Sequence, residues 1–450
     1  MKIAIVGSGI SSLTAAYKLN PFFDITVFEK NDYIGGHTNT INLNEAGRNL
    51  AIDTGFIVFN KKTYPNFVAL MDELKVGYQK TSMSFGVQCE RTGLVYNGTN
   101  FNKMFAQRKN ILKPSFYRFL FGIAKFNQKA KEFIASKDPQ KDSLSLGDFI
   151  ARAGIAADVV EFYLVPMAAA VWSADSKKMW DFPALFILRF WQNHGFLEVN
   201  DRPMWYVIKK GSKSYIPKIT ASFGDKIRLQ CKVEKVEKVL EGGSGIEVTY
   251  RDAQKRLRKS VFDKVVLGCH SDEAFKMLSG FSRQKDQLDK ILYQKNTAIL
   301  HSDLRVLAHN KLAHAAWNYY LPSKETKGVT VHYYMNILQG LKAKKPYIVS
   351  LNPEQEIEAE EIHRKIIYHH PIFTPNGMRA QKKLRDLSSK DGLYFAGAYL
   401  RYGFHEDGVL SGLKVYKKIK EELYANPMYV PRVHRAQKAQ PEGERLQIQY

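Results

Sequence analysis

The chain has 450 residues, of which 45% are hydrophobic and 25% are charged. This composition is typical of a globular protein with a sizeable core, and it excludes fibrous and disordered classes. Lysine and arginine number 67 against 44 aspartate and glutamate, so the formal net charge is +23. Such a charge attracts nucleic acid, anionic lipid or acidic substrates, although a generally basic proteome would produce the same balance.

Cysteine spacing and hydropathy indicate the cellular compartment of the protein. Cys89, Cys231 and Cys269 are too widely spaced for a disulfide framework or a CxxC metal site, which indicates a reducing compartment. No apolar run approaches the ~18 residues needed to cross a bilayer. Because Met1 and Lys2 lead directly into a strand pattern, we expect no signal peptide. The protein is therefore expected in the cytoplasm, or on the cytoplasmic surface of a membrane.

The strongest pattern lies in the first thirty residues. The apolar run 2–6 is typical of a buried strand, and it leads into a glycine turn, a helical pattern and a second apolar run that ends at Glu29. Gly7 permits the tight turn, and Gly9 lets a pyrophosphate approach the positive end of the helix. Glu29 is placed to bind the adenosine ribose. Ser12 replaces the third glycine of this fingerprint. That glycine normally allows the helix to pack closely on the strand.

Two further motifs resemble those of flavin enzymes. Residues 35–37 (GGH) resemble the ExxxxxGGR extension, with histidine in place of arginine. Residues 396–398 (AGA) and 402–412 (YGFHEDGVLSG) resemble the second flavin motif of the amine oxidase, protoporphyrinogen oxidase and phytoene desaturase superfamily. This resemblance implies that Gly408 and Val409 open a helix whose backbone N–H groups face the flavin.

The resemblance implies that the cofactor is FAD, bound non-covalently because no cysteine lies near the usual attachment position at Tyr402. It also implies that Val233 contacts the adenine through its backbone. The implied cofactor-binding residues are Gly7, Ser8, Gly9, Ser11, Ser12, Glu29, Lys30, Gly35, Gly36, His37, Thr38, Thr54, Gly55, Phe56, Val233, Gly397, Asp407, Gly408 and Val409.

Four stretches, 53–60, 63–67, 181–185 and 403–408, are similar to a bacterial subfamily of FAD-dependent oxidoreductases, and the similarity extends over residues 1–422. What the resemblance implies is an α/β fold in which a Rossmann-type FAD-binding domain is interleaved with an α+β substrate domain carrying a mixed sheet. The FAD-binding domain is expected to comprise residues 1–85, 205–270 and 385–424. The substrate domain is expected to comprise residues 86–204 and 271–384, followed by a disordered basic tail at 425–450.

Candidates for chemistry are fewer than candidates for cofactor binding. His405 lies beside the second flavin motif and has the titration range of a general base, although a packing histidine is the alternative. Tyr319 and Tyr334 lie in two alternating segments, 317–320 and 332–336, that we expect to form adjacent strands with one face toward the cavity. Local matching places Thr297 where amine oxidases of the superfamily usually carry a lysine, which lowers the case for amine oxidation.

Other histidines and serines support no further chemistry. His363, His369 and His370 show no metal-ligand spacing, so we expect no metal. The GGSG at 242–245 is interpreted as the turn of a β-hairpin between 226–239 and 246–250, because no helix follows it. The apolar segment 162–172 is interpreted as ordinary core, with the lining of an acyl tunnel as the alternative.

Segment 101–145 is basic and aromatic. It holds ten lysines and arginines against three acids, with many phenylalanines interleaved. This pattern is typical of an interfacial helix that docks on an anionic membrane. A helix that packs its aromatics into the protein's own core is the alternative. Because the chain shows no module that reads nucleic acid, specific nucleic-acid binding is not expected.

Three classes of function compete. The first is an FAD-dependent oxidase or desaturase acting on an apolar substrate, for which the subfamily resemblance implies a fatty acyl chain, with oxygen or another carrier as acceptor. Within this first class, a small amine is the alternative substrate. The second class is a non-redox lipid carrier of the same fold, and the third is a flavin-dependent isomerase. Sequence sets neither the acceptor nor the oligomeric state.

Overall fold

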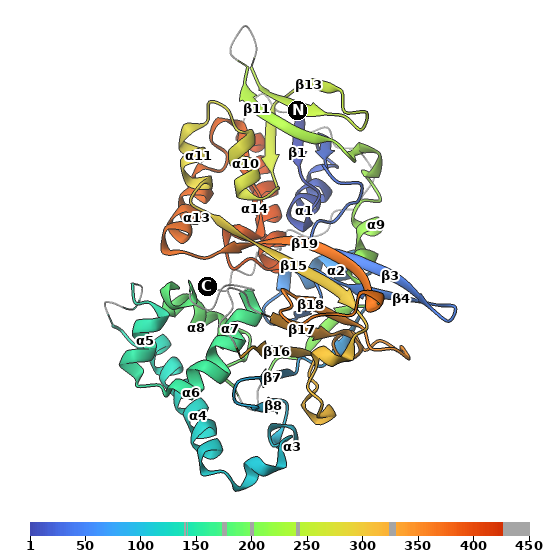
Figure 1. Cartoon of the computed structure of the whole chain (residues 1–450). Helices are drawn as coiled ribbons and strands as arrows, with labels where there is room; N and C mark the ends of the chain where they lie inside the picture. Colours follow the sequence, from blue (N-terminus) through green and yellow to red (C-terminus); the bar gives the residue numbers. More distant parts are fainter. Residues whose placement is uncertain are drawn as a thin grey trace.

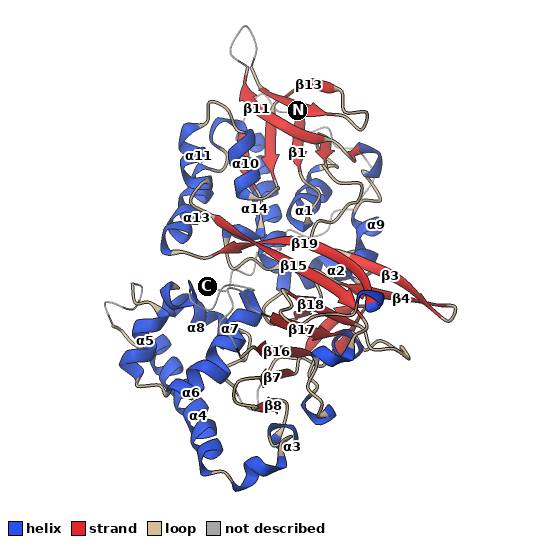
Figure 2. Ribbon diagram, in the orientation of Figure 1, coloured by secondary structure: helices blue, strands red, loops and turns tan. Residues whose placement is uncertain are grey.

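The computed structural model describes residues 1–138, 141, 143–172, 178–198, 202–239, 244–323 and 330–425. The tail predicted at 425–450, apart from its first residue, and the first part of the GGSG turn lie outside these residues. Figures 1 and 2 show an upper α/β region, a long strand pair across the middle, and a helical region below it.

The upper region is built on a five-stranded parallel sheet with the order β10-β2-β1-β14-β20. Its central strands are apolar and buried on both faces, as expected for a parallel sheet. Helices cover them, and on one face several residues within 233–262 pack against the sheet as well. The strands are β1 (Lys2–Val6), β2 (Asp24–Phe28), β10 (Ile227–Arg228), β14 (Lys264–Leu267) and β20 (Leu393–Phe395). The helices of this region are α1 (Ile10–Leu19), α2 (Pro65–Glu73), α9 (Ile216–Ile219), α10 (Ser271–Met277), α11 (Ser282–Leu288), α13 (Pro375–Leu387) and α14 (His405–Tyr424).

An antiparallel three-stranded sheet covers one end of this region. It contains β11 (Lys232–Lys238), β12 (Ile246–Arg251) and β13 (Leu257–Phe262). The pairing of β11 with β12 confirms the predicted hairpin. The register between these strands shifts at Val233, where a bulge interrupts the ladder next to the backbone predicted to contact adenine.

The middle of the molecule is a mixed seven-stranded sheet with the order β19-β15-β18-β17-β16-β7-β8. Its strands are β7 (Phe85–Cys89), β8 (Val95–Asn97), β15 (Leu292–His301), β16 (Trp317–Leu321), β17 (Thr330–Tyr334), β18 (Ile348–Leu351) and β19 (Ile362–Ile372). The antiparallel pairing of β16 with β17 confirms that the two predicted segments are neighbours. Helix α12 (Met335–Leu338) begins directly after β17. The predicted strand segment 332–336 is therefore a strand up to Tyr334 and helical after it.

Two small sheets join the upper region to the middle sheet. One pairs β3 (Thr40–Glu45) with β4 (Arg48–Asp53), and the other has the order β5 (Val58–Asn60), β9 (Trp205–Ile208), β6 (Tyr78–Thr81). The domain boundaries given above remain a prediction.

The lower region is helical and shares one apolar core with the middle sheet. Tyr319 and Val331 of the sheet pack in the same cluster as Phe119, Phe126 and Leu188 of the helices. The helices are α3 (Phe101–Met104), α4 (Pro114–Ala135), α5 (Leu146–Ala153), α6 (Ala157–Val159), α7 (Val165–Trp172) and α8 (Ala184–Asn193). In the part of the chain that the structure describes, no helix is both long enough and apolar enough to span a membrane.

Candidate active site

The turn after β1 leaves room for an anion at the start of α1. Gly7 has φ of +94°, and a Cβ added there would lie 3.2 Å from the carbonyl oxygen of Gly268 at the end of β14. A Cβ added at Gly9 would meet no atom within 4 Å. Helix α1 has no side-chain cap and no acidic residue in its first turn. Its positive end is therefore open to a phosphate, as the sequence predicted.

Ser12 shows how the chain manages without the third glycine. A Cβ added to Gly268 would overlap the Ser12 hydroxyl oxygen, so the missing space is provided by Gly268 of the neighbouring strand end. The Ser12 hydroxyl is buried and has no hydrogen-bond partner among the described residues.

Glu29 is buried at the end of β2 and oriented toward the same turn. Its Oε2 accepts hydrogen bonds from the Ser8 backbone N–H at 3.0 Å and the Ser8 hydroxyl at 2.6 Å, and its Oε1 accepts one from the Asn31 N–H at 2.8 Å. Oε2 thus accepts two hydrogen bonds and Oε1 only one, so Oε1 retains capacity to accept from a ribose hydroxyl. The ammonium of Lys30, another predicted cofactor contact, instead forms an ion pair with Glu273.

Helices α1 and α14 approach each other through their N-terminal turns. A Cβ at Gly408 would lie 2.7 Å from Ile10 Cγ2, and one at Gly412 would overlap the carbonyl oxygen of Ser11. The two glycines therefore bring two positive helix ends to one edge of the sheet. Helix α14 begins at His405, so the expectation that Gly408 opens it was wrong by three residues.

The acidic residues of the second motif accept hydrogen bonds from backbone N–H groups. The Phe404 N–H donates to Asp407 Oδ2 at 3.0 Å, which caps α14, and burial raises the pKa of Asp407 to about 6. Glu406 accepts from the N–H groups of Asn66 and Phe67, at 3.1 and 2.8 Å, at the start of α2. The Gly397 N–H donates to the hydroxyl of Ser411 at 2.7 Å.

Residues 35–38 and 54–56 form a second layer over the turn. A Cβ at Gly36 would lie 3.4 Å from Gly9 Cα, and one at Gly55 would overlap the carbonyl oxygen of His37. The Phe56 N–H donates to that same oxygen at 2.8 Å. These contacts bring together the predicted cofactor residues His37, Thr38, Thr54, Gly55 and Phe56.

His405 has the surroundings of a packing histidine, which was the alternative considered for it, and its role as a general base stays a prediction. Its ring is stacked on Phe56 with centroids 3.6 Å apart, and its Nε2 is 3.0 Å from the Thr38 hydroxyl and 3.2 Å from the Tyr215 hydroxyl. Burial lowers the pKa of His405 to about 3. An imidazole with this pKa holds a proton poorly at neutral pH, which makes it a weak general base.

The two candidate tyrosines lie on opposite faces of the middle sheet. Pairing of Trp317 with Tyr333, and of Tyr319 with Val331, places these four side chains on one face. Tyr334 is on the other face, where it packs beside Val306, Leu307 and Ile348. Tyr334 therefore cannot face the flavin together with Tyr319, and that expectation was wrong.

The face that carries Tyr319 is the one directed at the cofactor. It continues across the sheet through Tyr368, which stacks on His37 with ring centroids 5.0 Å apart and bonds the Thr54 hydroxyl at 2.9 Å. Trp317 and Tyr333, which the sequence did not single out, share this face and meet edge to face at 5.0 Å. The Trp317 Nε1 is buried without a partner among the described residues.

The register of β15 corrects the position matched to the amine oxidase lysine. Asn296 pairs with Tyr368 and shares its face, whereas Thr297 and the exposed Lys295 alternate with it and point to the other side. Thr297, the residue matched to that lysine, therefore points away from the face that carries Tyr368. Along this face of β15 the positions are Gln294, Asn296 and Ala298, so no lysine is directed at the cofactor from this strand.

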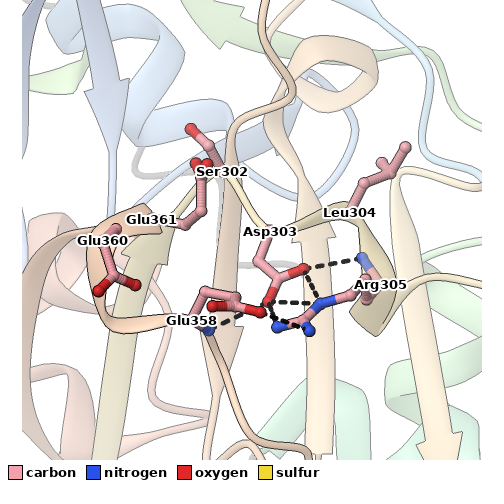
Figure 3. A pocket seen from close by; sticks show the side chains of 7 residues that line it. All are labelled: Ser302, Asp303, Leu304, Arg305, Glu358, Glu360 and Glu361. Carbon is pink, nitrogen blue, oxygen red and sulfur yellow. Dashed lines mark hydrogen bonds and ion pairs between the residues drawn. The ribbon is translucent and has the colours of Figure 1, made fainter.

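Two surface pockets lie near these elements, and the lining of the smaller one includes Asp407, a predicted cofactor residue. A cavity of about 480 Å³ lies between Asp303, Arg305 and Glu358 (Figure 3). Arg305 donates to Asp303 Oδ2 at 2.7 Å and pairs with Glu358 at 2.6 Å. Glu360 and Glu361 also line the cavity, so its lining is acidic. At ~3.3 Å per residue, the strand β15 separates this cavity from the residues paired with His370 by about 25–30 Å. The smaller pocket, lined by Tyr402, Phe404 and Glu406 among others, lies where α2, α8 and α14 meet.

The residues at the glycine turn fit FAD. The open space at Gly9 and the uncapped start of α1 lie where the cofactor pyrophosphate is expected, and the unpartnered His37 Nε2 belongs to the residue that follows the glycine pair over Gly9. Two helix N-termini, a buried acid after the second strand and a parallel sheet define a dinucleotide-binding flavoprotein.

Comparison with known proteins identifies the family. The family model for flavin-containing amine oxidoreductases matches residues 10–298, and the chain belongs to that family. It is an FAD-dependent oxidoreductase. No curated protein matches the sequence.

Solved structures share the fold at low sequence identity. Cyclohexylamine oxidase from Brevibacterium oxydans IH-35A is 16% identical with a TM-score of 0.67, over 94% of this chain and 99% of that one. Putrescine oxidase bound to putrescine is 15% identical with a TM-score of 0.65, over 94% and 99%. A fatty acid isomerase from P. acnes that produces CLA is 14% identical with a TM-score of 0.63, over 92% and 98%.

Proposed function

We propose that the protein oxidises an apolar substrate, namely a fatty acyl chain. The observation that carries this proposal is the character of the cofactor-directed face of the middle sheet. Its residues include Trp317, Tyr319, Val331, Tyr333 and Ala298, and they continue into the apolar core shared with the lower helices. Such a surface favours a hydrocarbon chain, because burying apolar area contributes roughly 25 cal/mol per Å².

The reaction is the removal of two hydrogens from adjacent acyl carbons. Bound FAD supplies the two-electron acceptor. The CH2–CH2 unit becomes CH=CH, and its two electrons and two protons pass finally to oxygen or another carrier. The protein's own contribution is to hold the chain against the aromatic face and exclude water. The indole N–H of Trp317, which lacks a partner, is available to the acyl carbonyl.

The decisive experiment is anaerobic reduction of the bound flavin. Oleoyl and palmitoyl phospholipids and the free acids are expected to bleach the visible flavin absorbance, with loss of two hydrogens from the chain by mass spectrometry. Putrescine and cyclohexylamine, the substrates named for two structural neighbours, are expected to leave the spectrum unchanged. Bleaching by amines alone would replace this proposal with amine oxidation. A shifted double bond without bleaching or mass change would instead identify an isomerase, the activity named for the neighbour from P. acnes.

Substitution of Trp317 tests the proposed contact with the acyl carbonyl. Trp317→Phe keeps an aromatic ring and removes the N–H donor, so KM for the acyl substrate is expected to rise about five- to tenfold, with kcat nearly unchanged. Tyr334→Phe is the matched control, because Tyr334 lies on the opposite face of the same strand pair. Equal KM values for the two variants would rule out this role for Trp317.

The lower tip of the molecule supports a membrane-borne source for such a substrate. Phe101, Ile111, Leu112 and Phe121 are 74, 47, 87 and 73% exposed, although Phe105, Phe116, Phe119 and Phe126 of the same segment are buried in the core. Residues 101–131 contain eight lysines and arginines and no acid. Helices α3 and α4 place this segment at the end opposite the sheet β11–β12–β13 (Figure 1). We propose that this tip docks on an anionic bilayer.

Vesicle sedimentation tests the docking. The protein is expected to pellet with phosphatidylglycerol vesicles and much less with phosphatidylcholine vesicles. The double variant Leu112→Glu and Phe121→Glu is expected to lose at least about tenfold in affinity, since burial of each side chain contributes ~1.5–3 kcal/mol. Leu257→Glu is the control, because Leu257 is 53% exposed on β13 at the other end of the molecule. Unchanged sedimentation of the double variant would exclude the tip as the docking surface.

A further inference from the structure

Three half-buried histidines from separate segments gather beside the glycine turn. The ring centroid of His37 is 5.4 Å from that of His370 and 6.0 Å from that of His270. His37 follows the Gly35-Gly36 pair, His270 precedes α10, and His370 lies on β19. Tyr368 stacks on His37 and Tyr293 stacks on His270, with centroids 5.0 and 4.6 Å apart.

The cluster borders both glycines of the predicted pyrophosphate site. Gly36, directly before His37, lies against Gly9, where an added Cβ would be 3.4 Å from Gly9 Cα. Gly268, two residues before His270, lies against Gly7. The backbone therefore delivers two of the three histidines to the loop that receives the cofactor phosphates.

The cluster offers polar atoms that the protein itself does not satisfy. His37 Nε2 is buried without a hydrogen-bond partner among the described residues. The Asn296 amide nitrogen lies 3.0 Å from His370 Nδ1. Because an amide N–H donates, Nδ1 of His370 accepts and the ring proton resides on Nε2. A buried nitrogen without a partner destabilises the empty site, and an anion with acceptor oxygens would remove that cost.

The surroundings keep these rings neutral when no anion is present. Burial, followed by the charges of the neighbouring histidines, lowers the pKa of His37 well below its usual value and that of His370 to about 4. Burial also lowers the pKa of His270, although nearby acids act in the opposite direction. The other titratable groups facing the cluster are Lys30, which pairs with Glu273, together with Asp272, Cys269, Tyr293, Tyr368, the exposed His369, and His405 on α14.

We propose that His37, His270 and His370 together form the positively charged counterpart of the flavin pyrophosphate, and that FAD binding is accompanied by proton uptake at this cluster. Two phosphate charges beside imidazoles in a low-dielectric site favour the protonated rings. The role that arginine serves in the GGR form of this motif is then divided among three titratable side chains. The inference rests on the FAD site and does not depend on the acyl substrate.

The direction of the pH dependence follows from linkage. The anion raises the pKa of the cluster, so the complex binds more protons than the free protein. At pH values between the pKa of the free cluster and that of the bound cluster, FAD affinity therefore weakens as the pH rises, by about tenfold per pH unit for each proton taken up. Affinity becomes independent of pH below the free pKa and above the bound pKa.

Calorimetry of FAD binding to the apoprotein measures the protons directly. Titrations at one pH in phosphate and in Tris, which differ in ionisation enthalpy, are expected to give different heats corresponding to net uptake of about half to one proton near pH 7. Flavin fluorescence quenching is expected to show a dissociation constant that rises as the pH is raised above about 4, the pKa of free His370. Equal heats in both buffers, or a dissociation constant that is flat with pH, would overturn the proposal.

Variants assign the uptake to the cluster. His37→Gln and His370→Gln are expected to reduce the proton uptake and flatten the pH dependence. His369→Gln is the matched control, because His369 is the exposed neighbour of His370 on the same strand. Wild-type uptake in both cluster variants would overturn the assignment. If a variant does not fold, retention of FAD by the wild-type holoprotein during dialysis at different pH values remains a test, and loss that is faster at low pH would contradict the proposal.

Discussion

Gly412→Ala is expected to destabilise the protein and to abolish FAD binding. A methyl group at this position would overlap the carbonyl oxygen of Ser11 and lie 2.9 Å from Thr14 Cβ. Backbone atoms cannot rotate away as a flexible side chain can, so α14 must move from α1. Overpacking of this kind costs about 1–3 kcal/mol. It also displaces the two positive helix ends that meet at the cofactor edge. Thermal unfolding with and without FAD, together with the flavin content of the purified protein, measures both effects.

Gly224→Ala is the control for this substitution. A Cβ at Gly224 would meet no atom within 4 Å, and its φ is not in the left-handed region. This variant is expected to unfold at the wild-type temperature and to retain its flavin. Full flavin content in Gly412→Ala would show that the close approach of α1 and α14 is not required for the cofactor site.

The FAD-binding edge was predictable because its signals are local. The apolar strand, Gly7, Gly9 and Glu29 lie within thirty residues, and each position follows from the geometry of one strand, turn and helix. Even the substitution of Ser12 for the third glycine left the prediction intact, because Gly268 provides the space from a distant strand.

The substrate face was harder to predict because alternation does not say which face is inside. The pattern around Tyr319 and Tyr334 predicted two strands correctly, but their register placed the two tyrosines on opposite sides. The same ambiguity applies to β15, where Asn296 and Thr297 lie on opposite faces. A local sequence shows that side chains alternate between the two faces of a strand. It does not show which set faces inward, because the neighbouring strands determine that.

The histidine cluster could not be found from spacing at all. His37, His270 and His370 are separated by more than two hundred and by one hundred residues, and the parallel sheet and β19 bring them together. His370 had been considered only beside His363 and His369 as a metal ligand. In the described residues no group of histidine, cysteine and acidic side chains forms a metal site. The contact between His370 and His37 comes from the fold and not from the spacing.

Glu29→Ala is expected to weaken FAD binding by about a hundredfold or more. Glu29 is the buried acid that the Ser8 and Asn31 N–H groups orient at 3.0 and 2.8 Å. Loss of its charge-assisted hydrogen bonds to a ligand costs about 1.5–3 kcal/mol each, and every 1.4 kcal/mol is about tenfold in affinity. The dissociation constant from flavin fluorescence quenching measures the effect. Glu29→Gln, which keeps the shape and one acceptor oxygen, is expected to lose less.

Glu73→Ala separates this effect from a general loss of stability. Glu73 pairs with Lys18 at 2.9 Å on the outer side of α1, with 41% of its side chain exposed. Because exposed ion pairs contribute only about 0–1 kcal/mol, this variant is expected to bind FAD as the wild type does. Wild-type affinity in Glu29→Ala would mean that the ribose is held elsewhere, and the orientation of the cofactor assumed for the histidine cluster would fail with it. A parallel loss in both variants would instead indicate that α1 itself had been disturbed.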